Sequence, residues 1–255
     1  PEGEFDTFKK EKDYEAALKT IEKLDEGINT YYSFQSRLSN VRTVISNNIM
    51  SGEDSITGPM QEAFMPFKQF FAELSGTTSD NLSDQELLKA ASAYLVPRMR
   101  AVGSGATSDF EANLYQKAAP SMGKTAEGNL LIANTMLQQG EQDINKQELM
   151  RQWVQANGNL TGFNKAYADA YNSTNQTGEK AMMTIDGVEY VAKRTFEQYD
   201  LEDWGKEDEN GTTNLEKLIS SGELQNGQTI ALKENGQWKL INFFQILLHL
   251  PFGIY

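Results

Sequence analysis

The sequence contains few of the residues that build catalytic or metal-binding sites. It has no cysteine, which excludes thiolate catalysis, disulfides and cysteine-based zinc sites in this chain. Its one histidine is His249, so a Ser-His triad or a multi-histidine metal site would depend on that single residue. The 36 aspartates and glutamates do not single out a carboxylate pair of the glycosidase kind. We therefore predict no catalytic, cofactor-binding or metal-binding residues, no cofactor and no enzymatic activity.

A Gly-Lys-Thr triplet at residues 123–125 matches the end of a nucleotide-binding P-loop. A P-loop also needs a glycine five residues before Gly123, and that position is Ala118. It follows a strand as well, whereas the segment before this triplet has helical periodicity. We therefore predict that Thr125 is the N-cap of a helix. The glycines of Gly103-Ser104-Gly105 are interpreted in the same way, as a chain reversal with positive φ and not as a ligand loop.

An acidic cluster near residue 205 is the remaining candidate for chemistry. Its members are Asp200, Glu202, Asp203, Glu207, Asp208 and Glu209. An EF-hand loop places oxygen ligands at positions 1, 3 and 5 and glycine at position 6. If Gly211 is the sixth residue, Lys206 is the first; if Gly205 is the sixth, Trp204 is the fifth. Neither register gives a calcium loop, so we predict a solvated acidic loop from Asp200 to Asn210.

Helical periodicity dominates the N-terminal part, from about Asp13 to Asn48. The apolar stripe has the alternating three- and four-residue spacing of a coiled-coil seam, with Gln35 as a polar interruption. Its members are Tyr14, Ala17, Ile21, Leu24, Ile28, Tyr31, Gln35 and Leu38, continued by Val41, Ile45 and Ile49. Two interpretations stay open, a self-associating coil and ordinary amphipathic helices of a bundle.

The middle of the chain carries repeated helix-start signals. Ser83, Ser108, Thr125 and Asn145 each precede an apolar helical pattern, and we predict four short helices from them. A further short helix is predicted after Pro59, and residues 157–162 read as a turn before a helical face at Phe163, Ala166, Tyr167, Ala170 and Tyr171.

The composition changes at Asn172, and the remainder is expected to contain strands. Asp186-Gly187 and Asn235-Gly236 each separate two apolar runs, which predicts two hairpins with type I′ turns. A short helix is predicted between them, at residues 215–219. The apolar end from Leu240 to Tyr255 is too short and too polar to span a bilayer. Three interpretations of it stay open: core packing, a partner interface, or contact with a membrane surface.

These patterns predict a mainly α fold, a multi-helix array with a long N-terminal helix and a small C-terminal region that contains β-hairpins. The predicted domains are a helical, possible coiled-coil segment at 1–50, a compact helical domain at 51–171, and a mixed region at 172–255. The net charge of −13 repels phosphate, so we expect no direct sequence-specific contact with nucleic acid. The apolar stripe and the apolar end lead us to expect a homo-oligomer or a docked partner. Because the chain begins with Pro1 and not methionine, we expect a processed product or a fragment.

One stretch of the sequence resembles virion proteins of tailed bacteriophages, of the structural or DNA-ejection type. The matching elements are Thr57-Gly58-Pro59, the turn and cap from Gly103 to Glu111, and the turn from Pro120 to Asn129, with a looser echo at residues 218–236. The match covers about Thr57 to Asn134, roughly a third of the chain. Its glycine, proline and cap positions specify shape and no chemistry.

The resemblance implies a virion location and a non-enzymatic role in particle assembly, in an internal or portal-associated structure, or in DNA ejection. The implied partners are capsid, portal or tail proteins, or further copies of the chain. A different class of function, a peptidoglycan-degrading virion enzyme that acts as the particle enters the cell, is kept as the alternative.

Overall fold

A computed structural model describes residues 2–52, 125–172, 180–194 and 196–244, together with Met65, Lys68, Gln69 and Ala72. Several predictions lie outside these residues. They are the helices after Pro59, Ser83 and Ser108, the reversal at Gly103, the Pro120 turn, Lys124, His249, and the apolar end beyond Phe244.

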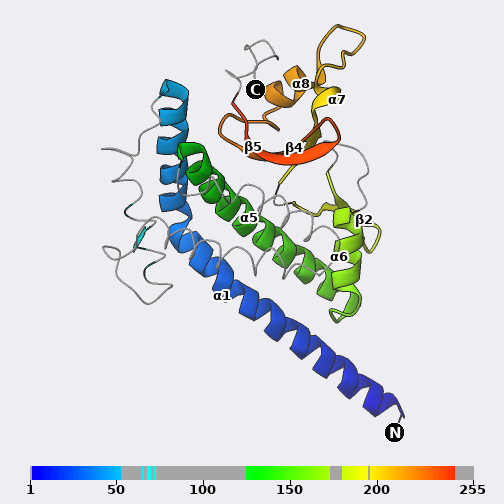
Figure 1. The fold of residues 1–255 in the computed structure, drawn as a ribbon. Coiled ribbons are helices and arrows are strands. Elements are labelled where there is room, and N and C mark those ends of the chain that lie inside the picture. The colour runs from blue at the N-terminus through cyan, green and yellow to red at the C-terminus, as the bar shows by residue number, and fades with distance from the viewer. Residues whose placement is uncertain are drawn as a thin grey trace.

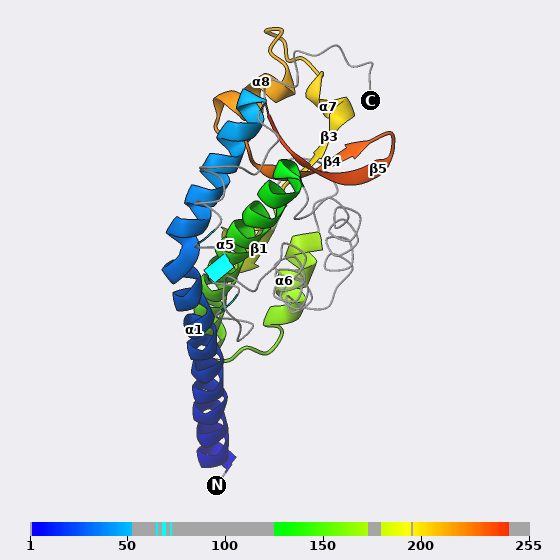
Figure 2. The same ribbon diagram turned by 60° about the vertical axis from the view of Figure 1, so that its left-hand side comes forward.

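Two long helices, α1 (Glu2–Ser51) and α5 (Ala126–Asn157), lie side by side and form the longest contact in the described structure (Figures 1 and 2). The apolar stripe of α1 is buried from Ala17 onward. Its buried members are Ala17, Ile21, Ile28, Tyr31, Leu38, Val41 and Ile45. Much of the predicted coiled-coil seam therefore packs within the chain, which favours the bundle interpretation over a self-associating coil. Replacing Ile21 with Asp would disrupt the chain's own core as well as any oligomer.

The N-terminal end of α1 extends beyond the rest of the described structure (Figures 1 and 2). Every side chain from Asp6 to Ala16 is exposed, including Phe8 at 55% and Tyr14 at 46%. The prediction of a partner or oligomer therefore depends on this end of α1 and on the apolar end beyond Phe244, and not on the buried stripe.

Helix α5 confirms one predicted helix start and corrects another. Thr125 is its N-cap, with extended backbone and a side chain that accepts a hydrogen bond from the Gly128 amide at 3.0 Å. The predicted start at Asn145 is wrong, because α5 continues without a break to Asn157 and ends at Gly158, where φ is 70°. Asn145 does not cap, because its side chain bonds to a neighbouring strand instead of to the helix backbone.

The predicted turn at residues 157–162 is confirmed, with positive φ at Gly158 and Gly162. Helix α6 (Phe163–Asn172) follows and buries Phe163, Tyr167, Ala170 and Tyr171, as its periodicity predicts. These side chains share one hydrophobic cluster with residues of α1, of α5 and of the first strand. The predicted domain boundaries stay predictions, although this cluster draws on all three predicted segments.

Both predicted hairpins are confirmed. Strands β1 (Met182–Ile185) and β2 (Val188–Val191) are antiparallel, and Asp186 and Gly187 have φ of 49° and 77°. Strands β4 (Thr229–Glu234) and β5 (Gln237–Asn242) are joined in the same way by Asn235 and Gly236, with φ of 49° and 76°. Positive φ at both central residues is the property of a type I′ turn.

Strand β3 (Gln198–Asp200) is not predicted by the sequence pattern. It pairs with β4 in parallel, which gives a three-stranded sheet in the order β3-β4-β5. Between β3 and β4 lie α7 (Leu201–Trp204) and α8 (Asn214–Ser220), which includes the helix predicted at 215–219. We call residues 198–244, with these elements, the C-terminal lobe. Its cluster of buried residues consists of Tyr199, Trp204, Leu224, Ile230, Leu232 and Phe243.

The predicted acidic loop therefore needs a correction at its start. Asp200 ends β3 and caps α7, accepting from the Glu202 amide at 3.1 Å. Leu201 and Trp204 are three residues apart, so both lie on the side of α7 that packs against the buried cluster of the C-terminal lobe. Burial of these two apolar side chains explains why the first part of the acidic run is helical. Only the residues after Trp204 form the loop.

Taken as a whole, the described structure is mainly α with a small mixed strand region in its C-terminal part. The residues that hold this region on the helices come mostly from α5.

Candidate functional site

A row of polar side chains on α5 connects the helices to the C-terminal strands. Asn134, Gln138, Glu141 and Asn145 are spaced by four, three and four residues, which places them on one face of the helix. We call these four residues the α5 seam. The described partners of all four lie between Val191 and Thr229, in β2, the segment after it, and β4 with the turn before it.

The first half of the seam holds the start of β4. The Asn134 side-chain amide donates to the Gly227 carbonyl at 2.6 Å and to the Thr229 hydroxyl at 2.9 Å. That hydroxyl donates in turn to the Asn242 side chain at 2.7 Å, and the Gln138 amide donates to the Thr229 carbonyl at 2.9 Å. Thr229 is fully buried, so these bonds satisfy polar groups that are shielded from water.

Helix α1 also packs against the start of β4, where Ser46 lies beside Gly227. A Cβ added at Gly227 would lie 2.6 Å from the Ser46 hydroxyl oxygen, and the φ of Gly227 is 78°. Glycine is therefore needed both for the backbone conformation and for the close approach of α1. The Asn242 side chain also donates to the Glu127 carbonyl at 2.9 Å, which links β5 to the first turn of α5.

The second half of the seam binds the outer edge of β2. The Asn145 amide nitrogen donates to the Val191 carbonyl at 2.9 Å, and its oxygen accepts from the Lys193 amide at 2.8 Å. One side-chain amide thus takes the place of a peptide group from a neighbouring strand, and it covers part of an edge that would otherwise be open to pairing. The Lys193 ammonium forms an ion pair with Glu141, one turn earlier on the seam.

The segment after β2 is also tied to α6. Arg194 is buried, donates to the Tyr171 carbonyl at 3.2 Å and lies 6.0 Å from the Tyr171 ring. A cation at the carbonyl end of a helix is favourable because the helix dipole is negative there. Burial raises the pKa of Glu197, and the positive charges of Arg194 and Lys193 partly oppose that rise. Burial lowers the pKa of Lys146, whose ammonium lies 5.5 Å from the centre of the Tyr167 ring.

The face of α5 that meets α1 is built differently. The Tyr31 ring lies directly on Gly140, where an added Cβ would come within 2.0 Å of a ring carbon. The Tyr31 hydroxyl donates to the Leu137 carbonyl at 3.1 Å, and burial raises the pKa of this tyrosine. Arg151 binds both oxygens of Asp25, at 2.9 and 3.1 Å, and Gln147 donates to the same carboxylate.

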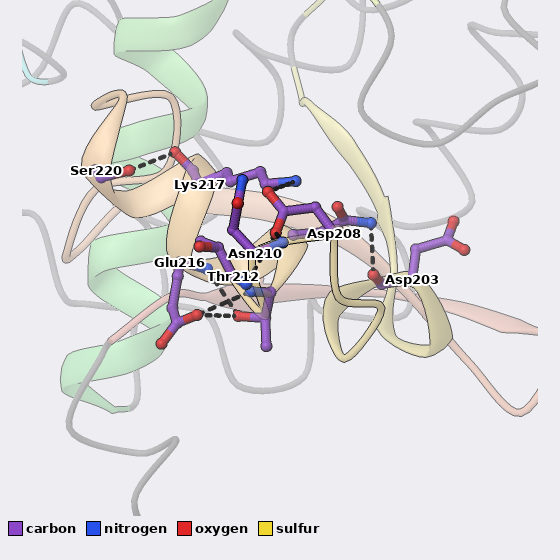
Figure 3. Close-up of polar contacts among 9 residues, drawn as sticks. Asp203, Asp208, Asn210, Thr212, Glu216, Lys217 and Ser220 are labelled. Atoms are coloured by element: carbon purple, nitrogen blue, oxygen red, sulfur yellow. Dashed lines mark hydrogen bonds and ion pairs between the residues drawn. The ribbon is translucent and has the colours of Figure 1, made fainter.

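A second polar cluster lies at the tip of the C-terminal lobe, in the loop from Lys206 to Thr213 and the start of α8 (Figure 3). One Asp208 oxygen accepts from the amides of Asn210 and Thr212, and the other lies 3.0 Å from the Lys217 ammonium. The hydrogen bond from Lys217 and those from the two amides lower the pKa of Asp208. Thr213 and Glu216 form the capping box of α8, so the acidic residues here order a turn and a helix start.

These arrangements fix backbone segments through hydrogen bonds and ion pairs. In the described ranges, no three His, Asp or Glu side chains are grouped closely enough to hold a metal ion. No helix within the same ranges is both long enough and apolar enough to cross a bilayer.

The sequence patterns did not predict the α5 seam. A usable signal was present, because Asn is an unfavourable residue in a helix interior, and two asparagines at matched spacing indicate partners outside the helix. Within the stretch that resembles virion proteins, the structure describes residues 125–134 and four residues between 65 and 72, and Thr125 serves as a helix cap.

Comparison with known proteins gives no relatives for this chain. No family model matches it, no curated protein matches its sequence, and no solved structure matches its fold.

Proposed function

We propose that this chain is a non-enzymatic virion component of a tailed bacteriophage. It would act in particle assembly, in an internal or portal-associated structure, or in DNA ejection. The observation that carries the proposal is the sequence resemblance between Thr57 and Asn134. Where the structure describes the last part of this stretch, its residues cap and begin α5. A role in shape agrees with the glycine, proline and cap positions that make up the resemblance.

The described geometry supports a role in binding other proteins. Helices α1 and α5 form an elongated pair, and the C-terminal lobe is fixed to α5 by hydrogen bonds between side chains and backbone. The end of α1 offers exposed Phe8 and Tyr14 among charged residues. As part of the proposal, α1 remains one continuous long helix in solution and presents this end to a neighbouring virion protein.

The charge of the chain favours protein partners over DNA. With a formal net charge of −13, the chain as a whole repels phosphate. The proposed partners are therefore capsid, portal or tail proteins, or another copy of the chain. Contact with the genome would be indirect, through those partners.

Mass spectrometry of particles tests the proposal. Virions of the phage that encodes this chain are purified through two density gradients, and their proteins are quantified against a capsid standard. We expect the chain at a fixed copy number per particle. Its absence from infectious particles, with abundant chain in the infected cell, contradicts the proposal. Zymography of the purified chain on cell-wall substrate separates it from the alternative, because a peptidoglycan-degrading enzyme clears the substrate and a structural component does not.

A further inference from the structure

The chain contains four Asn-Gly pairs, which are the sequences most open to a spontaneous covalent change. They are Asn157-Gly158, Asn210-Gly211, Asn226-Gly227 and Asn235-Gly236. In such a pair the glycine amide nitrogen can attack the asparagine side-chain carbonyl carbon, and the missing Cβ of glycine leaves the approach open. The reaction requires the glycine amide to rotate freely, so hydrogen bonding of that amide protects the pair.

Three of the four pairs are protected in this way. The Gly158 amide donates to the Val154 carbonyl at 2.7 Å and forms the C-cap of α5. The Gly211 amide donates to the Asp208 carbonyl at 3.0 Å, within the ordered loop of Figure 3. The Gly227 amide donates to the Phe243 carbonyl at 2.7 Å, and Gly227 is itself buried beside Ser46.

The fourth pair is different. Asn235 and Gly236 are exposed, and they form the tip of the β4–β5 hairpin. Exposure does not distinguish this pair, because the pairs at 157–158 and 210–211 are exposed as well. The difference lies in the glycine amide: within the described part of the chain, the Gly236 amide donates no hydrogen bond. The glycine amide can therefore reorient here without first losing the hydrogen bond that must break in each of the other three pairs.

We propose that Asn235 is the site at which this folded chain deamidates. The Gly236 nitrogen gives up its proton to hydroxide and forms a bond to the Asn235 side-chain carbonyl carbon. The bond from that carbon to the side-chain nitrogen breaks as this nitrogen takes a proton from water, which restores the hydroxide, and ammonia leaves. Water then opens the five-membered ring at either carbonyl, which gives aspartate or isoaspartate at residue 235. No oxidant, metal or enzyme takes part.

The two products affect the hairpin differently. Aspartate keeps the length of the backbone and tolerates the left-handed conformation. Isoaspartate adds one carbon to the main chain of a two-residue turn, next to the Glu234–Gln237 pair that closes it. A two-residue type I′ turn fixes strand register, so the longer backbone strains the pairing of β4 with β5. Because Ile230 and Leu232 of β4 belong to the core of the lobe, that strain reaches beyond the tip.

Peptide mapping of the aged full-length chain tests the proposal. The folded protein is incubated in mildly alkaline buffer and digested, and aspartate and isoaspartate are distinguished by electron-transfer fragmentation. We expect Asn235 to convert several-fold faster than Asn157, Asn210 or Asn226. A parallel sample in denaturant is the control: there the four rates should converge, because the protecting hydrogen bonds are gone. The N235D variant supplies the reference for the aspartate product.

Two outcomes would overturn the proposal. One is conversion of any of the other three asparagines at the rate of Asn235 or faster in the folded chain. The other is a rate at Asn235 that is no higher than at asparagines followed by a residue other than glycine, such as Asn214 before Leu215. The β1–β2 hairpin gives an internal comparison, because Asp186-Gly187 has the same turn conformation but loses water instead of ammonia and should convert more slowly.

Discussion

The two faces of α5 meet their neighbours by different means. Toward α1 the contact combines the buried apolar stripe of α1, Tyr31 lying on Gly140, and the Asp25–Arg151 pair near one end. Toward the C-terminal strands it consists of the α5 seam, whose amides bond to backbone groups of β4 and of the segment after β2. Apolar packing contributes free energy but tolerates sliding, whereas bonds between amides and backbone fix one register.

This difference suggests that the two contacts have separate tasks. The α1 contact holds the long helices together over many residues, so no single polar group decides it. The α5 seam bonds directly to backbone groups of the strands and of the segment after β2, so one lost bond changes their position. In a virion component of the proposed kind, the seam would set how the C-terminal lobe is presented to a neighbour.

The largest expected effect comes from adding a side chain at Gly140, the point where Tyr31 of α1 lies directly on α5. In G140A the new methyl group collides with the Tyr31 ring, and we expect a loss of about 3 kcal/mol in unfolding free energy, although alanine favours helix. Urea unfolding measures the loss. The control is G205A, since Gly205 has φ of −83° and open space around its Cβ position. Equal stability of both variants would show that Tyr31 does not lie on Gly140.

Substitution of Asn145 in the α5 seam should lower the unfolding free energy by less, and its effect should be confined to the segment that Asn145 binds. In N145D the donor to the Val191 carbonyl becomes a carboxylate oxygen that faces it, which we expect to cost about 2 kcal/mol. Hydrogen exchange should rise in residues 188–194 while the α1 contact keeps its protection. The matched control is N164D, an exposed change of the same kind on α6. Uniform loss of protection in both regions would mean that the two contacts are not separate.

Removal of the Thr125 cap should affect the start of α5 and neither contact directly. We expect T125A to lower the unfolding free energy by about 1 kcal/mol, because the Gly128 amide loses its acceptor. The conservative variant T125S keeps the hydroxyl and should retain most of the stability. If T125A destabilised the chain more than N145D, the cap would be a major determinant of the fold and the α5 seam a minor one.

Low pH should destabilise the loop around Asp208 at the tip of the C-terminal lobe, away from the contact of α5 with α1 and from the α5 seam. Because the pKa of Asp208 is lowered in the folded state, its contribution to stability is complete above the ordinary aspartate pKa of about 3.9 and is lost as pH falls through the lowered value. The effect is small, since the pair with Lys217 is exposed to solvent. K217M should reduce the acid sensitivity of melting temperature in this range, and an unchanged profile would assign the sensitivity to other carboxylates.

Local chemistry made much of the fold predictable. Asp-Gly and Asn-Gly between apolar runs specify type I′ turns because few other residues accept positive φ twice in succession. The cap at Thr125 and the buried face of α6 were equally predictable, since caps and periodicity depend on neighbours in sequence. Contacts between residues distant in sequence could not be predicted. Strand β3 has three residues and exists because β4 pairs with it, and the start predicted at Asn145 failed because partners nearly 50 residues away occupy its side chain.

Cross-linking mass spectrometry of purified particles tests the central claim most directly. Lys9, Lys10 and Lys12 lie on the exposed end of α1, and Lys193 lies beside the α5 seam. A structural virion component of the proposed kind should give cross-links from the three N-terminal lysines to a capsid, portal or tail protein or to a second copy, and links within the chain around Lys193. Particles that contain no such chain, or in which those three lysines link only within it, would contradict the account.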